Sequence, residues 1–220
     1  MRETFIIEIN GPSGVGKSFI FEKIKNFNNI TVDQISLSRK ESFILNINLI
    51  RYVFFALYYT IVFSPQNLIK GYQIFRIIIN HIYKIQRIKY SKYSIIVLDE
   101  GIVQKVLSIV DRSKNAQYEF VFSKLKSLLE MDGLMIIIKA NINVIKERKG
   151  LRNSARDQNK QSFEYINETV KAFEEAEKYL LKSKFNVIIY ENNNAMDSNI
   201  IISEIKDIVD NYCNKLKENN

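Results

Sequence analysis

Residues 11–18 constrain the fold of this 220-residue chain more than any other segment, because they read GPSGVGKS. This is the pattern G-x-x-x-x-G-K-[ST] in full, and it follows a short apolar run, Phe5 to Ile9, that is typical of a buried strand. Glycines in such a loop let successive backbone N–H groups turn inward around phosphate oxygens, and the helix that follows presents its N-terminus to the anion. The segment therefore predicts a strand, a phosphate-binding loop and a helix in succession.

Each residue of this loop is a candidate for nucleotide binding: Gly11, Pro12, Ser13, Gly14, Val15, Gly16, Lys17 and Ser18. The Lys17 ammonium can reach the β and γ phosphates of a nucleoside triphosphate, and the Ser18 hydroxyl can ligate Mg²⁺. ATP and Mg²⁺ are therefore the expected cofactors.

A second apolar run, Ser94 to Leu98, ends in Asp99 and has the form of a Walker B strand. We expect Asp99 to hold Mg²⁺ beside Ser18, directly or through water. Three roles are open to the next residue, Glu100. It could activate water, as in an ATPase, or accept a proton from a substrate hydroxyl, as in a kinase, or serve a structural or substrate-orienting purpose. For a kinase, Glu100 is the preferred base.

Three arginines recur at intervals of four residues in KERKGLRNSARD: Arg148, Arg152 and Arg156. Forked guanidinium groups stabilise the negative charge that spreads over a phosphoryl group during its transfer. We expect residues 148–160 to form a lid, looped from Gly150 onward, whose closure excludes water and favours transfer over hydrolysis.

Short apolar strands alternate with helices along the whole chain. The strands are expected at residues 5–9, 30–32, 94–98, 134–139 and 186–190. This alternation predicts an α/β fold whose parallel sheet is covered on both faces. With two prolines and seven glycines there is little material for linkers, so we expect one domain over 1–220. Residues 41–93 form a helical insertion, in which Ser64-Pro65 separates helices at 44–63 and 67–89.

The first insertion helix, residues 43–63, carries one charge, Arg51, and approaches the length of a membrane span. Asn46 and Asn48 interrupt it, so we expect a helix buried between the core and its partner helix. A lipid-facing surface and a dimer interface are the alternatives, and peripheral membrane contact through 43–93 and a homodimer both stay open. Residues 74–93 carry five basic side chains and no acidic one. This charge suits a solvated face, a membrane-surface patch or an anion-binding wall, and His81 is expected to pack between helices.

The chain carries a formal net charge of +8, which suits anionic partners. No nucleic-acid-binding module accompanies this charge, so nucleic acid is not an expected partner. The single cysteine, Cys213, cannot form an internal disulfide, and the single histidine argues against a zinc site. The first ten residues lack the basic-then-apolar order of a signal peptide, so a cytoplasmic location is expected.

The motifs GPSGVGKS, VLDEG and R-x-x-x-R-x-x-x-R, in this order, resemble the P-loop nucleoside and nucleotide kinase superfamily, near its thymidylate-kinase-like group. The resemblance implies a three-layer fold with a five-stranded parallel sheet in the order 2-3-1-4-5, ATP with Mg²⁺, a lid, and an acceptor-binding insertion between strands 2 and 3. The chain departs from the family at Asp99-Glu100-Gly101, where thymidylate kinases usually show Asp-Arg-aromatic and deoxynucleoside kinases Glu-Arg-Ser. Asp33 and Arg39, just beyond the second strand, are candidates for acceptor binding.

These features predict an ATP-dependent phosphotransferase, that is, a kinase acting on a small-molecule acceptor such as a nucleoside, a nucleotide or a sugar-like metabolite. The first alternative is a P-loop ATPase or nucleotide-dependent switch that uses Asp99 and Glu100 for hydrolysis. The second is a nucleotide-binding protein without catalysis, whose basic helices engage a membrane or nucleic acid.

Overall fold

A parallel β-sheet forms the centre of the protein, as seen in a computed structural model that describes residues 4–27, 30–32, 50, 52–62, 67–89, 95–99, 101–113, 118–126, 133–151, 163–183 and 185–218. Its five strands are β1 (Phe5–Asn10), β2 (Thr31–Val32), β3 (Ile95–Leu98), β4 (Gly133–Lys139) and β5 (Asn186–Glu191). They lie in the order β2-β3-β1-β4-β5, and each neighbouring pair is parallel. The predicted α/β fold with a parallel sheet is confirmed.

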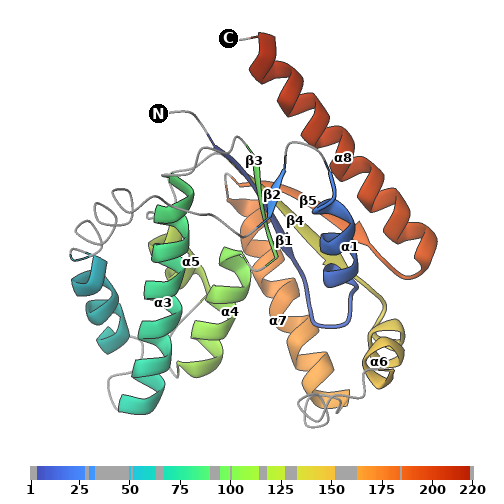
Figure 1. The fold of residues 1–220 in the computed structure, drawn as a ribbon. Helices are drawn as coiled ribbons and strands as arrows, with labels where there is room; N and C mark the ends of the chain where they lie inside the picture. Colours follow the sequence, from blue (N-terminus) through green and yellow to red (C-terminus); the bar gives the residue numbers. More distant parts are fainter. Residues whose placement is uncertain are drawn as a thin grey trace.

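Helices cover both faces of this sheet (Figure 1). On one face lie α1 (Lys17–Ile24) and α8 (Ala195–Glu218). On the other lie α3 (Leu68–Lys89), α4 (Ile102–Arg112), α5 (Tyr118–Lys126) and α7 (Phe163–Lys182). The short α6 (Ile142–Gly150) follows the carboxyl end of β4, and residues 52–62 form one more helix beside α3.

The two faces of the sheet bury separate hydrophobic clusters, because successive side chains of a strand point in opposite directions. In β1, Ile7 and Ile9 pack with α1 and α8, whereas Ile6 packs with the helices on the other face. Both faces are covered, so the strands read as nearly continuous apolar runs rather than alternating ones. Parallel strands share one carboxyl edge, and the loops that leave this edge carry the polar residues of interest.

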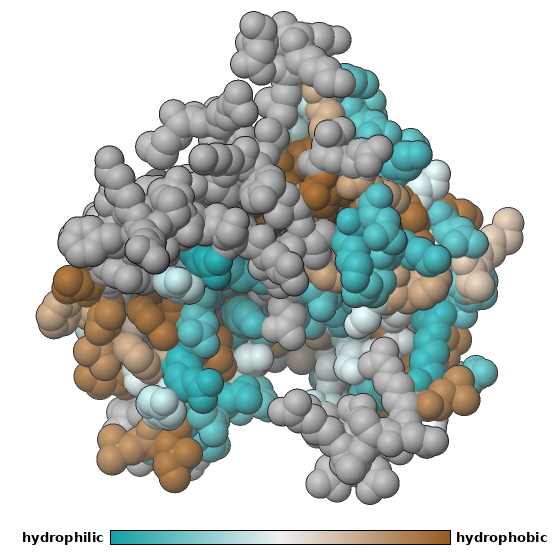
Figure 2. All heavy atoms as spheres, viewed as in Figure 1, coloured by the Kyte–Doolittle hydropathy of each residue, from teal (hydrophilic) through white to brown (hydrophobic). Residues whose placement is uncertain are grey.

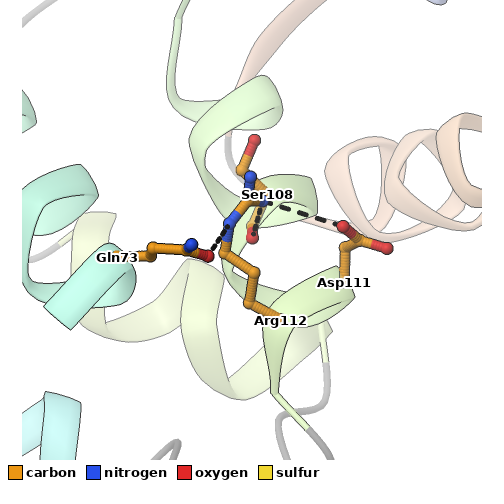
Figure 3. Close-up of polar contacts among 4 residues, drawn as sticks. All are labelled: Gln73, Ser108, Asp111 and Arg112. Carbon is orange, nitrogen blue, oxygen red and sulfur yellow. Dashed lines mark hydrogen bonds and ion pairs between the residues drawn. The ribbon is translucent and has the colours of Figure 1, made fainter. Parts of the chain in front are cut away.

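The helical insertion lies between β2 and β3, and α3 packs against α4. Figure 3 shows a polar contact that ties these two helices together. Arg112 Nε donates to Gln73 Oε1 at 3.2 Å, and the same guanidinium donates to the Ser108 carbonyl at 2.8 Å and lies 3.7 Å from the Asp111 carboxylate. One guanidinium therefore links α3 to the last turn of α4.

The first insertion helix differs from its prediction. Ala56 is buried, and Tyr52, Phe55 and Tyr59 pack on the core, but the opposite side of residues 52–62 is exposed and equally apolar. The predicted burial of this helix between the core and a partner helix is therefore confirmed only for the side that contacts the core. Residues 41–49 of the predicted insertion lie outside the described residues. None of the described helices is both long enough and apolar enough to cross a membrane.

The boundaries of two helices follow from local contacts and residue types. The last helix, α8, begins at Ala195 because a capping box starts it. Asn194 Oδ1 accepts from the N–H groups of Met196 (2.8 Å) and Asp197 (3.0 Å), while the Asp197 carboxylate accepts from Asn194 N–H at 3.1 Å. Gly150, predicted to open a loop, is instead the last residue of α6, where the helix has already formed and glycine costs little.

Candidate functional site

The loop between β1 and α1, which we call the phosphate loop after its predicted role, is built around glycines in backbone conformations that other residues rarely adopt. Gly11, Gly14 and Gly16 have φ angles of 148°, 99° and 94°. A Cβ on Gly11 would collide with the Ile138 carbonyl oxygen, and a Cβ on Gly16 would lie 2.6 Å from Asn192 Nδ2. The predicted succession of strand, glycine loop and helix is confirmed. Glycine is required at these positions both by the sign of φ and by the available space.

Lys17 folds back over this loop. Its Nζ donates to the carbonyl oxygens of Gly11 at 2.6 Å and Pro12 at 3.0 Å. The Ser18 hydroxyl is exposed in the first turn of α1. Throughout α1, which the structure describes in full, no acidic residue occupies the first turn and no side chain caps the N-terminus. The N-terminus of α1 thus carries neither an acidic side chain nor a side-chain cap, which favours an anion at this position.

Asn192 follows the last residue of β5 and holds the phosphate loop in place through hydrogen bonds. The sequence analysis did not predict this role. Its Nδ2 donates to the Val15 carbonyl at 2.7 Å, and its Oδ1 accepts from Ser198 Oγ at 2.7 Å. Its backbone N–H donates to the Lys139 carbonyl at 2.8 Å. The side chain is fully buried, so all of these bonds are shielded from water. Asn192 therefore links the phosphate loop to β4 and to α8.

Arg148, predicted to belong to a lid, lies in the last turn of α6 beside this loop. Its Nη1 donates to the carbonyl oxygens of Asn192 at 2.9 Å and Val15 at 3.3 Å. The structure thus brings Arg148 and the phosphate loop together. Arg152, Arg156 and the remainder of the predicted lid after Leu151 lie outside the described residues.

Asp99 follows the last residue of β3, the strand that pairs with β1 on one side. In that register Leu98 lies opposite Glu8, so Asp99 reaches the same carboxyl edge from which the phosphate loop leaves. Its side chain is half-buried. Three other residues that the sequence offered as candidates, Glu100, Asp33 and Arg39, lie outside the described residues.

Glu8 is a buried carboxylate in the middle of β1 that sequence reasoning missed. It accepts a hydrogen bond from Ile102 N–H at 2.9 Å, at the N-terminus of α4, where the N-cap residue Gly101 has no side chain to serve as a cap. Burial raises the pKa of Glu8, and the hydrogen bonds from Ile102 and Asn10 and the charge of Lys84 partly offset this rise. A charged residue inside the apolar run FIIEIN was the sequence signal for it.

Gly101 and Glu8 lie so close together that a substitution at one position changes the packing at the other. A Cβ on Gly101 would overlap the Glu8 carboxylate. The turn that carries Asp99 is therefore held between β3 and α4 by a carboxylate from the neighbouring strand, and the absence of a side chain at residue 101 makes this contact possible.

A cavity of about 310 Å³ opens beside Pro12, between the carboxyl ends of β4 and β5 and helix α7. Its apolar wall is made by Ile137, Ala140, Val170 and Phe173, and its polar rim by Lys139, Asn141, Glu174, Glu177, Glu191 and Asn193. Lys139 Nζ lies 3.2 Å from Glu177 Oε2. The rim therefore carries more negative than positive charge.

His81 occupies the packing position expected of it on the inner side of α3, and it is 1% exposed. Neither ring nitrogen has a hydrogen-bond partner among the described residues. Burial, together with the charges of Lys105 and Lys84, lowers the pKa of His81 to about 3. The imidazole is thus neutral at physiological pH and is not suited to proton transfer there.

Comparison with solved structures identifies the fold. A deoxyadenosine kinase from M. mycoides with products dCMP and dCDP is similar with a TM-score of 0.59 and 13% identity, over 92% of this chain and 100% of that one. The same kinase with bound dATP gives a TM-score of 0.54 and 16% identity, over 91% and 99%. A shikimate kinase from Bacteroides thetaiotaomicron gives 0.47 and 9%, over 94% and 98%. The chain has the fold of these deoxyadenosine kinase structures.

No protein-family model matches the chain, and no curated protein matches it in sequence.

Proposed function

We propose that the protein is an ATP-dependent phosphotransferase that acts on a small-molecule acceptor. The observation that carries this proposal is the glycine-built loop between β1 and α1, with the Lys17 ammonium above it and Asp99 at the end of the adjacent strand. The likeness in fold to deoxyadenosine kinases supports a kinase of this architecture.

The residues of the loop fit the phosphates of ATP and a magnesium ion. Gly11, Gly14 and Gly16 adopt the positive φ angles with which such a loop turns its backbone N–H groups toward an anion, and Lys17 brings a positive charge to the N-terminus of α1. Ser18 and Asp99 offer the hydroxyl and carboxylate oxygens that Mg²⁺ prefers. When bound, Mg²⁺ would neutralise charge on the phosphate oxygens. The described residues contain no cluster of three or more acidic, histidine or cysteine ligands, so these two side chains would bind the metal together with phosphate and water.

Further roles are assigned to residues around this loop. Glu100 would accept the proton of the acceptor hydroxyl, because it follows Asp99 at the carboxyl edge of the sheet. Arg148, Arg152 and Arg156 would surround the transferring phosphoryl group and exclude water. For Arg148 this requires exchange of its present bonds to the Val15 and Asn192 carbonyls for phosphate.

The cavity beside Pro12 favours an uncharged acceptor. Its rim holds Glu174, Glu177 and Glu191 against one lysine, and Lys139 is already paired with Glu177. A phosphate group on the acceptor would meet net repulsion there, whereas hydroxyl groups would find acceptors for their hydrogen bonds. Deoxynucleosides are therefore the first acceptors to test, followed by sugar-like polyols and then nucleotides. Asp33 and Arg39 follow β2, which β3 and β1 separate from β4, so they are candidates for contacts to an acceptor held by the insertion rather than by this cavity.

Transfer of labelled γ-phosphoryl from ATP tests the proposal. The purified protein is incubated with Mg²⁺, γ-labelled ATP and a panel of deoxynucleosides, polyols and nucleoside monophosphates, and labelled products are separated. We expect one class to be labelled by the wild type and by Lys25→Ala, which changes the exposed C-cap lysine of the same helix, a residue that pairs with Glu22. Lys17→Ala should lose at least about a hundredfold in rate, because a charge stabilising the transferred group is removed. Equal rates for Lys17→Ala and wild type would refute the assignment.

The same assay separates transfer from hydrolysis. Rapid release of labelled inorganic phosphate without any acceptor, lost in Glu100→Gln, would instead establish the ATPase alternative. A kinase should release phosphate slowly and respond to its acceptor.

A further inference from the structure

The helix formed by residues 52–62 has no charged side chain and is apolar on both sides. Its inner side contacts the core through Tyr52, Phe55, Ala56 and Tyr59. Its outer side exposes four residues at helical spacing, Phe54, Leu57, Tyr58 and Ile61, of which Phe54 is 70% exposed. A helix that is apolar all round is normally covered on both sides. The outer side of this helix therefore needs a covering partner.

The exposed apolar surface continues onto the first turns of α3. Leu68 is 93% exposed, and Ile69 and Tyr72 are exposed as well. Figure 2 shows this surface as two brown areas, one over residues 52–62 at the left and one below it at the start of α3. Exposed apolar surfaces of this kind mark sites of protein or membrane interaction. We call these seven residues, Phe54, Leu57, Tyr58, Ile61, Leu68, Ile69 and Tyr72, the apolar surface.

The segment of the chain that carries the apolar surface has charged side chains of one sign only. Between Ser42 and Leu98 the chain has no Asp or Glu, although it has 24 acidic residues elsewhere. The same stretch has seven basic residues: Arg51, Lys70, Arg76, Lys84, Arg87, Lys89 and Lys92. Lys70 and Arg76 are exposed on α3, and the Arg76 guanidinium lies 5.9 Å from the Tyr72 ring. Among the described residues of the neighbouring helices, exposed carboxylates lie at Asp111 on α4 and Glu119 on α5.

This combination distinguishes between two occupants of the apolar surface. In a twofold dimer each copy presents the same patch to the other, so the cations Lys70 and Arg76 of each copy would face a patch that has basic residues but no carboxylate of its own. An anionic bilayer instead offers hydrocarbon to the apolar side chains and negative headgroups to the cations. Tyrosine and phenylalanine are the side chains that settle at such an interface.

We propose that the apolar surface, with Lys70 and Arg76 beside it, docks the protein on an anionic membrane surface. The helix of residues 52–62 is about 16 Å long, which is about half the thickness of the hydrocarbon core of a bilayer. It therefore lies in the plane of the interface, with its outer side buried below the headgroups. This docking is independent of phosphoryl transfer.

Vesicle co-sedimentation of the full-length protein tests this proposal. One set of vesicles is phosphatidylcholine alone, and the other contains about one third phosphatidylglycerol. We expect sedimentation with the anionic vesicles and at least about tenfold weaker binding to the neutral ones, with the difference shrinking as salt is raised. Failure of the wild type to bind anionic vesicles at low salt would overturn the proposal.

Three variants connect this binding to the apolar surface. Phe54→Ser/Tyr58→Ser/Ile61→Ser should bind at least about tenfold more weakly, because apolar area is lost from the contact. Lys70→Gln/Arg76→Gln should lose about tenfold on anionic vesicles only. The control Leu181→Ser/Met196→Ser/Ile200→Ser changes three exposed apolar residues on α7 and α8 and should bind as the wild type does.

All of these side chains point outward, so we expect each variant to fold, and thermal melting verifies this. Equal binding by the Phe54/Tyr58/Ile61 variant and the wild type would contradict the proposal. A second result would also contradict it: the wild type is a dimer in sedimentation velocity and does not bind vesicles, whereas the Phe54/Tyr58/Ile61 variant is a monomer. That result would assign the apolar surface to a second copy of the chain.

Discussion

The Asn192 side chain donates to the Val15 carbonyl at 2.7 Å, across 177 residues of sequence. Through this bond the residue that follows β5 supports the phosphate loop. The same side chain accepts from Ser198 of α8, so the loop, the sheet edge and the last helix are held by one buried amide.

Asn192→Asp tests this support with little change in size. A carboxylate can still accept from Ser198, but it offers no donor to the Val15 carbonyl. A carboxylate oxygen and the Val15 carbonyl oxygen, both acceptors, would then face each other. We expect a loss of about 1–3 kcal/mol in the free energy of unfolding, together with weaker ATP binding. Urea denaturation and ATP titration measure the two effects. Asn199→Asp, on the exposed side of α8, serves as the control, and equal behaviour of both variants would contradict the assigned role.

Gly101→Ala tests the contact between the Asp99 turn and β1. The added methyl overlaps the Glu8 carboxylate, so the variant should lose about 1–3 kcal/mol of stability. Combining it with Glu8→Ala removes the colliding carboxylate, and the double variant should lose less than the sum of the two single changes. Strict additivity in urea denaturation would show that the two residues are not coupled.

His81 should make the protein sensitive to acid. Its folded-state pKa of about 3 lies below the ordinary value of 6.5, so the unfolded chain binds the extra proton first. Stability is therefore lost as the pH falls from about 6.5 toward 3, by at most about 1.4 kcal/mol for each pH unit. His81→Phe removes this term. Measured by urea denaturation, the variant should gain stability relative to the wild type as the pH is lowered from 7 to 5, and a pH-independent difference between the two would be inconsistent with a neutral buried imidazole.

Glu8 should act in the opposite direction. Its pKa is raised in the folded state, so its contribution is fully present below the unfolded pKa and is lost as the pH rises through the folded pKa. Glu8→Gln keeps an oxygen that can accept from Ile102 N–H but cannot ionise. Relative to the wild type, this variant should gain stability as the pH is raised from about 4 to 8. Urea denaturation at each pH measures this difference, and a stability difference between the two proteins that stays constant from pH 4 to 8 would contradict it.

The strands and the phosphate loop were predictable because their signals are local. A run of four to seven apolar residues that is buried on both faces of a sheet can be recognised without knowing the rest of the fold. The glycines at 11, 14 and 16 are required by the backbone of the loop itself. Asp99 could be placed by the same reasoning, since it ends such a run.

The supports of the site were not predictable because their partners are remote in sequence. Glu8 finds its donor 94 residues away at Ile102, and Asn192 finds its acceptor at Val15. Nothing in the sequence near residue 192 distinguishes it from Asn193 or Asn194. The two sides of residues 52–62 have the same apolar composition, so only the structure reveals which side contacts the core.

Binding of Mg-ATP by isothermal titration tests most directly the claim that residues 11–18 hold the phosphates of ATP. The account predicts saturable binding by the wild type and by Lys25→Ala, and at least about tenfold weaker binding by Lys17→Ala with an unchanged melting temperature. Binding of ATP by Lys17→Ala with wild-type affinity, or no binding of ATP by the wild type, would contradict it.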